Sequence, residues 1–218
     1  PLPDGVLEVL DLHLIGRAGG SQLSQALAAI NLDELLTALD VGVQRRHRLR
    51  LAEIKDLDAA LVVGSFLRKD HPLIAQRLRQ AAKQGTRVSL IGLGGDDQLI
   101  KLNANLAVAP ADLAKTLAAV VKAVAEIKGV AIPAGLEGAA ASEATWRIAQ
   151  SLVDGEKRVI FLGNAATQSA QATQLHALAV ELGTLINARV GFLGEGANTV
   201  GGHVARALPT GANARTMF

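Results

Sequence analysis

The most regular hydrophobic pattern in the chain begins with residues 59–63 (AALVV), a continuous apolar run typical of a strand buried on both faces. A polar connection over residues 64–71 leads to Pro72, which suits the first turn of a helix. Apolar residues then recur at helical spacing as far as Gly85, and residues 86–91 (TRVSLI) make the next strand. These segments predict a β-α-β unit whose two strands are parallel neighbours.

The pattern continues with a short strand at residues 106–108 and a long helix that ends at Gly129. A segment rich in Gly, Ala and Pro follows over residues 131–141, and it is the best candidate for a boundary. We therefore expect a first α/β lobe over residues 1–130 and a second over residues 131–218.

The second lobe repeats the order of elements found in the first. A helix over residues 142–153 precedes an apolar strand at residues 159–162, and Gly163 opens a polar loop. We expect the helix after this loop to stop at Gly183. Residues 185–218 are rich in Gly and Asn, which predicts extended loops outside the core.

A strand followed by Gly, a polar loop and a helix thus occurs twice, at Gly64 and at Gly163. This repetition predicts an α/β fold with a doubly wound, mostly parallel, Rossmann-like sheet. Ligands of such sheets bind beyond the carboxyl ends of the strands, where helix N-termini attract anions. The candidate binding positions are therefore Gly64 and Ser65 in one loop, and Gly163 and Asn164 in the other.

Composition narrows the chemistry. The 218 residues include no Cys, so this chain contains no disulfide, thiolate metal site or cysteine-held cluster. A net charge of +2 is too small for a general polyanion binder, and the basic run at residues 45–50 lacks interleaved aromatics. No span of 18 apolar residues exists that could cross a membrane. Because Pro1 is not a translation start, we expect a piece of a longer protein.

Catalytic and metal-binding motifs are missing. The sequence has no phosphate-binding P-loop and no nucleophile elbow, and the five His residues have no metal-ligand spacing. The turn after Ile91 has Asp97 where a dinucleotide fingerprint needs Gly, and the Gly64 loop carries the apolar Phe66 and Leu67. We predict no catalytic and no metal-binding residues, while a bound nucleotide stays open as an alternative.

Specific strings nevertheless resemble the molybdopterin oxidoreductase superfamily, in particular the large iron–sulfur subunit of NADH-quinone oxidoreductase (respiratory complex I, the G or 75-kDa type). The resemblance covers about residues 58–92 and 157–210. Its most specific part is the string GEGANTVGG at residues 194–202, which contains Asn198 and Gly201. The other matching strings are ALVVGS (60–65), HPL (71–73), RLR (77–79), AA (81–82) and VIFLGN (159–164).

This resemblance implies the C-terminal, molybdopterin oxidoreductase-like piece of that subunit. The family holds its iron–sulfur clusters on cysteines of the N-terminal part, so we expect no cofactor in this fragment. Members that bind a molybdopterin guanine dinucleotide use two loops, and also an acidic residue after the strand that here ends at Ile91. That position reads Gly-Leu-Gly in this sequence. The cofactor-binding positions that the resemblance implies are vestigial at best: Gly64, Ser65, Gly163, Asn164, Asn198 and Gly201.

The function that we expect is therefore a non-catalytic scaffold supporting electron transfer from NADH to quinone in the peripheral arm, and this fragment alone is expected to be inactive. Its expected partners are the rest of its own subunit and other peripheral-arm subunits, with no nucleic acid and no direct membrane insertion. Its expected place is peripheral, on the cytoplasmic side of the bacterial inner membrane. Two alternatives remain: a molybdopterin guanine dinucleotide-binding part of a molybdenum oxidoreductase, and a self-contained NAD(P)-binding domain.

Overall fold

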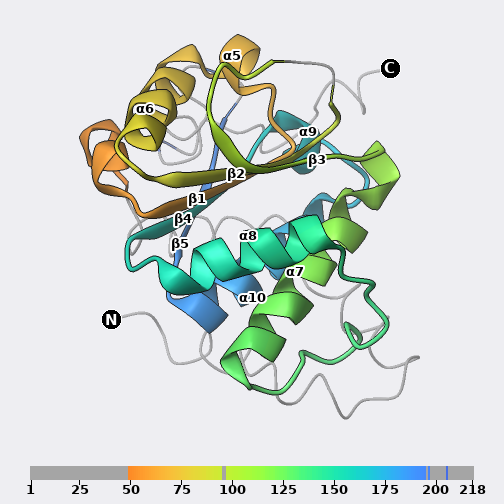
Figure 1. Ribbon diagram of the computed structural model, residues 1–218. Coiled ribbons are helices and arrows are strands. Elements are labelled where there is room, and N and C mark those ends of the chain that lie inside the picture. Colours follow the sequence, from red (N-terminus) through yellow and green to blue (C-terminus); the bar gives the residue numbers. More distant parts are fainter. Residues whose placement is uncertain (1–48, 95–96, 195, 197–204, 206–218) are drawn as a thin grey trace, which may run out of the picture. The chain divides into compact units, whose positions relative to one another are not determined.

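The computed structural model describes residues 49–94, 97–194, 196 and 205 (Figure 1). Five strands form one sheet in the order β3-β2-β1-β4-β5, and every neighbouring pair is parallel. The strands are β1 (Ala59–Val63), β2 (Arg87–Gly92), β3 (Leu102–Ala107), β4 (Arg158–Leu162) and β5 (Arg189–Phe192). The expected α/β class and the parallel pairing of the first two strands are confirmed.

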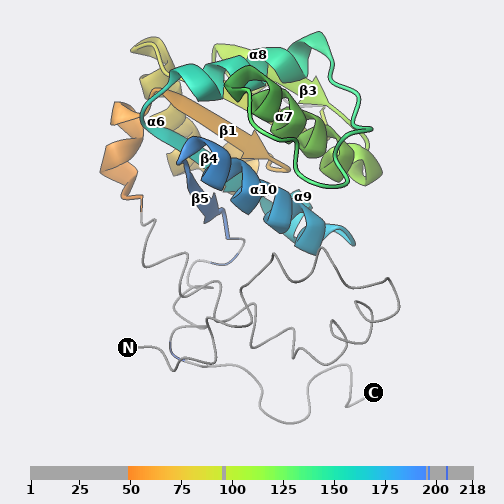
Figure 2. The same cartoon turned by 90° about the horizontal axis from the view of Figure 1, so that it is seen from below.

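Helices cover both faces of this sheet. One face carries the short helix η1 (Leu51–Asp56) and α6 (Pro72–Lys83). The opposite face carries α7 (Leu113–Lys128), α8 (Glu143–Asp154) and α10 (Ala172–Ile186), which lie side by side in Figure 2. Single turns are η2 (Pro110–Asp112), α5 (Leu67–Asp70) and α9 (Asn164–Thr167). The arrangement is doubly wound, as the two strand–loop–helix repeats predict.

The central strand β1 supplies both layers of the core, because alternate side chains of a strand point to opposite faces. Leu61 and Val63 pack with α7, α8 and α10, whereas Ala60 and Val62 pack with α6. All five residues of β1 are buried, which explains the continuous apolar run in the sequence. Full burial of each larger side chain stabilises the fold by about 1.5–3 kcal/mol.

Strands on both sides of the expected lobe boundary belong to this one sheet. β1 pairs directly with β4, from Ala59 opposite Arg158 to Val63 opposite Leu162. The division of the chain into residues 1–130 and 131–218 stays a prediction.

The helix stop expected at Gly183 is wrong, because α10 continues to Ile186 and ends at Asn187 in the left-handed conformation. Gly183 lies inside the helix for a packing reason. A Cβ atom at this position would come within 2.7 Å of Val190 Cγ2 and 3.2 Å of the Ala188 carbonyl oxygen. The glycine thus allows α10 to approach β5 closely, and the sequence pattern cannot separate this role from helix termination.

The expected extended tail after Leu185 is also wrong in its first residues. Residues 189–192 form β5, whose Val190 is buried against β4 and α10. Only four residues make this strand, so its apolar signal is weaker than that of the glycines around it. Two smaller differences concern β3, which begins at Leu102 instead of residue 106, and the loops after β1 and β4, which contain the single turns α5 and α9.

Candidate functional site

The candidate site lies at the carboxyl ends of β1 and β4, where the order in which the chain adds strands to the sheet reverses. After β1 the chain enters α6 on one face, whereas after β4 it enters α10 on the other face (Figure 1). Open α/β sheets bind their ligands at this kind of switch point. The two loops that begin at Gly64 and Gly163 therefore stand where the sequence analysis places a ligand.

Backbone hydrogen bonds tie the two loops to the sheet and to each other. The Gly64 amide donates to the Ile91 carbonyl oxygen at 2.8 Å, and the Gly163 amide donates to the Val63 carbonyl oxygen at 2.8 Å. Between the loops, the Ala165 amide donates to the Gly64 carbonyl oxygen at 2.9 Å. The start of the second loop thus bonds directly to the first.

Both glycines are needed for this close approach. A Cβ atom on Gly64 would lie 2.6 Å from the Ala166 nitrogen, and Gly64 has a φ of 65°, which disfavours other residues. A Cβ atom on Gly163 would collide with the Ser65 Cβ and lie 2.6 Å from the Gly64 carbonyl oxygen. Because the loops are in van der Waals contact, no space is left between them at these residues for a pyrophosphate.

The amides of the last three residues of α9 bond within the protein. Ala166 and Thr167 donate to the Gly163 carbonyl oxygen at 3.1 and 3.0 Å, and Ala165 donates to Gly64. An anion at this position would have to replace those bonds. The helix also has only four residues, so its dipole is small.

Ser65 and Asn164 are the polar side chains at the switch point. Ser65 is only 4% exposed, and its hydroxyl oxygen has no hydrogen-bond partner among the described residues. The Asn164 side chain is half-buried and makes no hydrogen bond with the described part of the chain. Among the candidate residues that the structure describes, Ser65 is therefore the one whose buried polar atom is left for a further contact.

The neighbouring strand end offers no carboxylate. Gly92 ends β2, and Leu93 packs against the apolar core on the α7 side. The first described carboxylate beyond it belongs to Asp97, whose Oδ1 accepts from the Leu99 amide at 2.8 Å. Its backbone oxygen accepts from the Arg68 guanidinium. The described residues directly after β2 are therefore glycine and leucine, and they offer no carboxylate that could accept a hydrogen bond from the ribose hydroxyl of a nucleotide.

His71 takes part in the local backbone hydrogen bonds: its amide donates to the Leu67 carbonyl oxygen, and its carbonyl oxygen accepts from the Ala75 amide. His71 joins α5 to α6, and its Nε2 is buried without a hydrogen-bond partner among the described residues. Burial holds the pKa of His71 below its usual range, and the Asp70 carboxylate acts in the opposite direction. The described residues contain no group of three or more His, Asp or Glu side chains placed to hold a metal ion.

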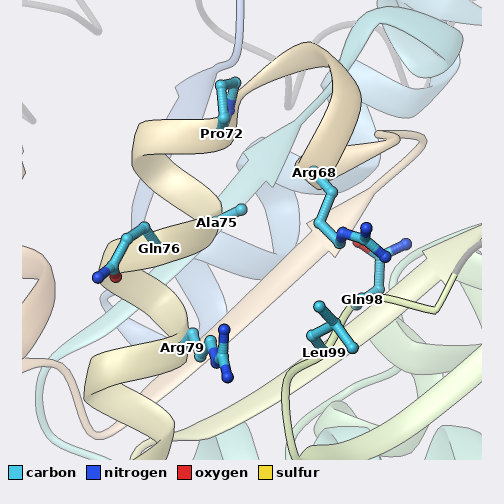
Figure 3. A pocket seen from close by; sticks show the side chains of 7 residues that line it. All are labelled: Arg68, Pro72, Ala75, Gln76, Arg79, Gln98 and Leu99. Carbon is cyan, nitrogen blue, oxygen red and sulfur yellow. The ribbon is translucent and has the colours of Figure 1, made fainter.

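Asn198 and Gly201, the candidate positions from the tail, lie outside the described residues. Within residues 49–94 and 97–194, no helix is long and apolar enough to cross a bilayer. Sequence reasoning missed a hollow of about 250 Å³ between α6 and residues 97–99 (Figure 3). The one signal in the sequence is the excess of Arg and Lys over residues 67–83.

One comparison with known proteins gives a match. A family model described as molybdopterin oxidoreductase matches residues 15–215, which is nearly the whole chain. No curated protein matches the sequence.

Proposed function

The chain belongs to the molybdopterin oxidoreductase family, and we propose that it is a non-catalytic scaffold domain of that family. More specifically, we propose that it serves the iron–sulfur subunit of NADH-quinone oxidoreductase, as the resemblance of its loop sequences implies. In that role it packs on the cluster-bearing part of the subunit and on neighbouring subunits of the peripheral arm, outside the membrane. Its contribution to electron transfer from NADH to quinone is to bury and position those parts.

The observation that supports this proposal is the direct contact between the two loops of the switch point. The Ala165 amide, which could bind a phosphate, already donates to the Gly64 carbonyl oxygen. The close contact between Gly163 and Ser65 occupies the space between the loops. An anion that loses its hydration there without gaining hydrogen bonds is destabilised by several kcal/mol.

The molybdopterin guanine dinucleotide that the family implies does not fit between these loops. Besides the closed contact, the Gly64 loop contains the apolar residues Phe66 and Leu67, and Leu67 is fully buried in the core. β2 ends at Gly92, and the described residues directly after it carry no carboxylate. We therefore derive no chemistry through this group, and we propose that the family fold is kept here as architecture.

The proposal is tested on the protein purified from its own membranes after mild detergent extraction. We expect this chain to co-migrate with NADH:quinone oxidoreductase activity on a native gel, identified by its peptides in mass spectrometry. A matched gel lane stained for another respiratory complex is the control. Migration of the chain away from that activity would contradict the scaffold role.

A second candidate function is favoured by one observation, the buried Ser65 hydroxyl without a partner among the described residues. Such an atom suits a ligand phosphate at the switch point, as in a molybdenum oxidoreductase. Molybdenum content and the fluorescence of oxidised pterin, measured on the natively purified protein, separate the two candidates. We expect neither signal in proportion to this chain, and one equivalent of each would support the second candidate.

A further inference from the structure

The outer surface of α5 and α6 is strongly basic. Residues 67–83 contain five Lys or Arg residues and one acidic residue, Asp70, although the whole chain is close to neutral. All five basic residues are exposed: Arg68, Lys69, Arg77, Arg79 and Lys83. This concentration of charge is local to one face of the sheet.

A hollow of about 250 Å³ lies within this surface, between α6 and residues 97–99. We call it the basic groove. Figure 3 shows the Arg79 side chain reaching from α6 toward Leu99, while Arg68 lies across Gln98 at the other end. The residues that line the basic groove include Arg68, Gln76, Arg79, Gln98 and Leu99.

The carboxylates that the structure describes beside the basic groove form no ion pair with its arginines. Asp70 Oδ2 accepts from the Phe66 amide at 3.3 Å, and Asp97 Oδ1 accepts from the Leu99 amide. Arg68 donates to a backbone carbonyl oxygen, so no described carboxylate compensates its charge. Arg79 forms no hydrogen bond or ion pair with any described residue. Two guanidinium groups therefore face the groove with charge available for a ligand.

Apolar side chains border the same groove. Leu99 lines it and is 51% exposed, with a φ of 50° that is unusual for leucine. Pro72 and Ala75 of α6 also line it. Exposed apolar surface beside arginines suits contact with another protein.

We propose that the basic groove is a docking site for an acidic peptide segment of a partner protein, with an apolar side chain of that segment contacting Leu99. Guanidinium groups pair well with carboxylates, and Leu99 supplies exposed apolar surface for the peptide to cover. A free phosphate is a poorer match, because the donors are two side chains from separate elements, not converging amides. Nucleic acid is also a poorer match, because no aromatic side chain lines the groove for stacking. The inference does not rest on the proposed scaffold function.

The probe is a short fluorescein-labelled peptide of Glu, Asp and Leu, compared with a neutral analogue that carries Gln and Asn in place of the acids. Fluorescence anisotropy with the full chain measures binding at low and at physiological ionic strength. We expect the acidic peptide to bind and the neutral analogue to bind at least about tenfold more weakly. The affinity of the acidic peptide should fall as salt rises.

Two substitutions on the same helix form a matched pair. Arg79→Gln removes a charge from the basic groove, whereas Arg77→Gln removes an equal charge from a position that does not line it. We expect Arg79→Gln to weaken the acidic peptide about tenfold and Arg77→Gln less than about twofold. Neither side chain bonds to a described residue, so both variants should unfold at the same temperature as the wild type.

Leu99→Asn tests the apolar contact separately, because Asn accepts the left-handed conformation that Leu99 adopts. We expect weaker binding of the acidic peptide with no loss of thermal stability. Equal losses from Arg79→Gln and Arg77→Gln would overturn the docking site in favour of a net-charge effect. Absence of binding by the acidic peptide, or its displacement by millimolar inorganic phosphate or GDP, would also overturn it.

Discussion

The Ala165 amide donates a hydrogen bond of 2.9 Å to the Gly64 carbonyl oxygen, and this bond joins the two loops of the switch point. The relationship is unexpected for a sheet that is built to hold a ligand, because both groups lie where a ligand would compete for them. Around the bond, glycine on each loop permits a contact that any side chain would prevent. The closed switch point is therefore built from backbone, and substitutions at its glycines test it.

Gly163→Ala should destabilise the protein by about 2–3 kcal/mol, because the new Cβ meets the backbone and side chain of the facing loop. Urea unfolding followed by circular dichroism measures the change. Gly138→Ala is the control, since a Cβ at Gly138 meets nothing within 4 Å, and its effect should stay within about 0.5 kcal/mol. Equal effects of the two substitutions would contradict the close contact.

Gly183→Ala should also destabilise the protein, by about 1–2 kcal/mol, although alanine favours a helix by about 1 kcal/mol over glycine. The reason is the approach of α10 to β5, where a Cβ would meet Val190 Cγ2 at 2.7 Å. A double-mutant cycle with Val190→Ala measures the coupling between the two positions. We expect the double variant to lose less stability than the sum of the single variants. Strict additivity would show that α10 does not press on Val190.

Asp58→Asn should make the free energy of unfolding depend less on pH. Asp58 Oδ2 accepts from the amides of Lys157 and Glu156, at 2.8 and 2.9 Å, and these bonds hold the pKa of Asp58 below its usual range. Since the folded pKa is lowered, the stabilisation is present above the unfolded pKa of about 4 and is lost as pH falls through the folded value.

At neutral pH we therefore expect Asp58→Asn to cost about 1 kcal/mol, allowing for screening by solvent. Thermal unfolding from pH 7 to pH 2 should show the two proteins converging in stability at low pH. Asp56→Asn is the control, because the Asp56 side chain is exposed and makes no hydrogen bond in the described residues. A difference between wild type and Asp58→Asn that stays constant down to pH 2 would refute this role.

Arg158→Lys should lower stability by about 1–3 kcal/mol, because the guanidinium donates to backbone carbonyl oxygens at the ends of two helices. These oxygens belong to Val153 in α8, to Gly155 after it and to Ile186 in α10. A lysine ammonium cannot reach all three. Arg189→Lys, which alters only an exposed ion pair with Glu53, is the matched control and should change stability by less than about 0.5 kcal/mol.

The strands and helices that have long apolar patterns could be predicted from the sequence. β1, β4 and α7 lie within a residue or two of the expected positions, because each is buried along most of its length. β5 could not be predicted, since it has only four residues and one of them is Gly191, and its stability comes from pairing with β4. The structure also explains why position 183 is glycine: Val190, seven residues later in the sequence, lies too close for a Cβ atom.

The two loops lie at the switch point of the sheet, because the repeat of strand, glycine and helix fixes where that point falls. That their residues form a binding site stays a prediction. The closure of the switch point could not be read from the same residues. A glycine that admits a phosphate and a glycine that admits a facing loop look identical in sequence. The basic groove was missed for a similar reason, since spacing alone does not bring residues 97–99 beside α6.

Guanine nucleotide binding tests the closed switch point most directly. Thermal unfolding of the purified chain is measured with increasing GDP up to millimolar concentration, and in parallel with NADH. A ligand that binds only the native state raises the unfolding temperature, and the rise grows with the logarithm of ligand concentration above its Kd. The closed contact between Gly163 and Ser65 predicts no shift with either nucleotide. A rise that grows with GDP concentration and disappears in Ser65→Ala would contradict it.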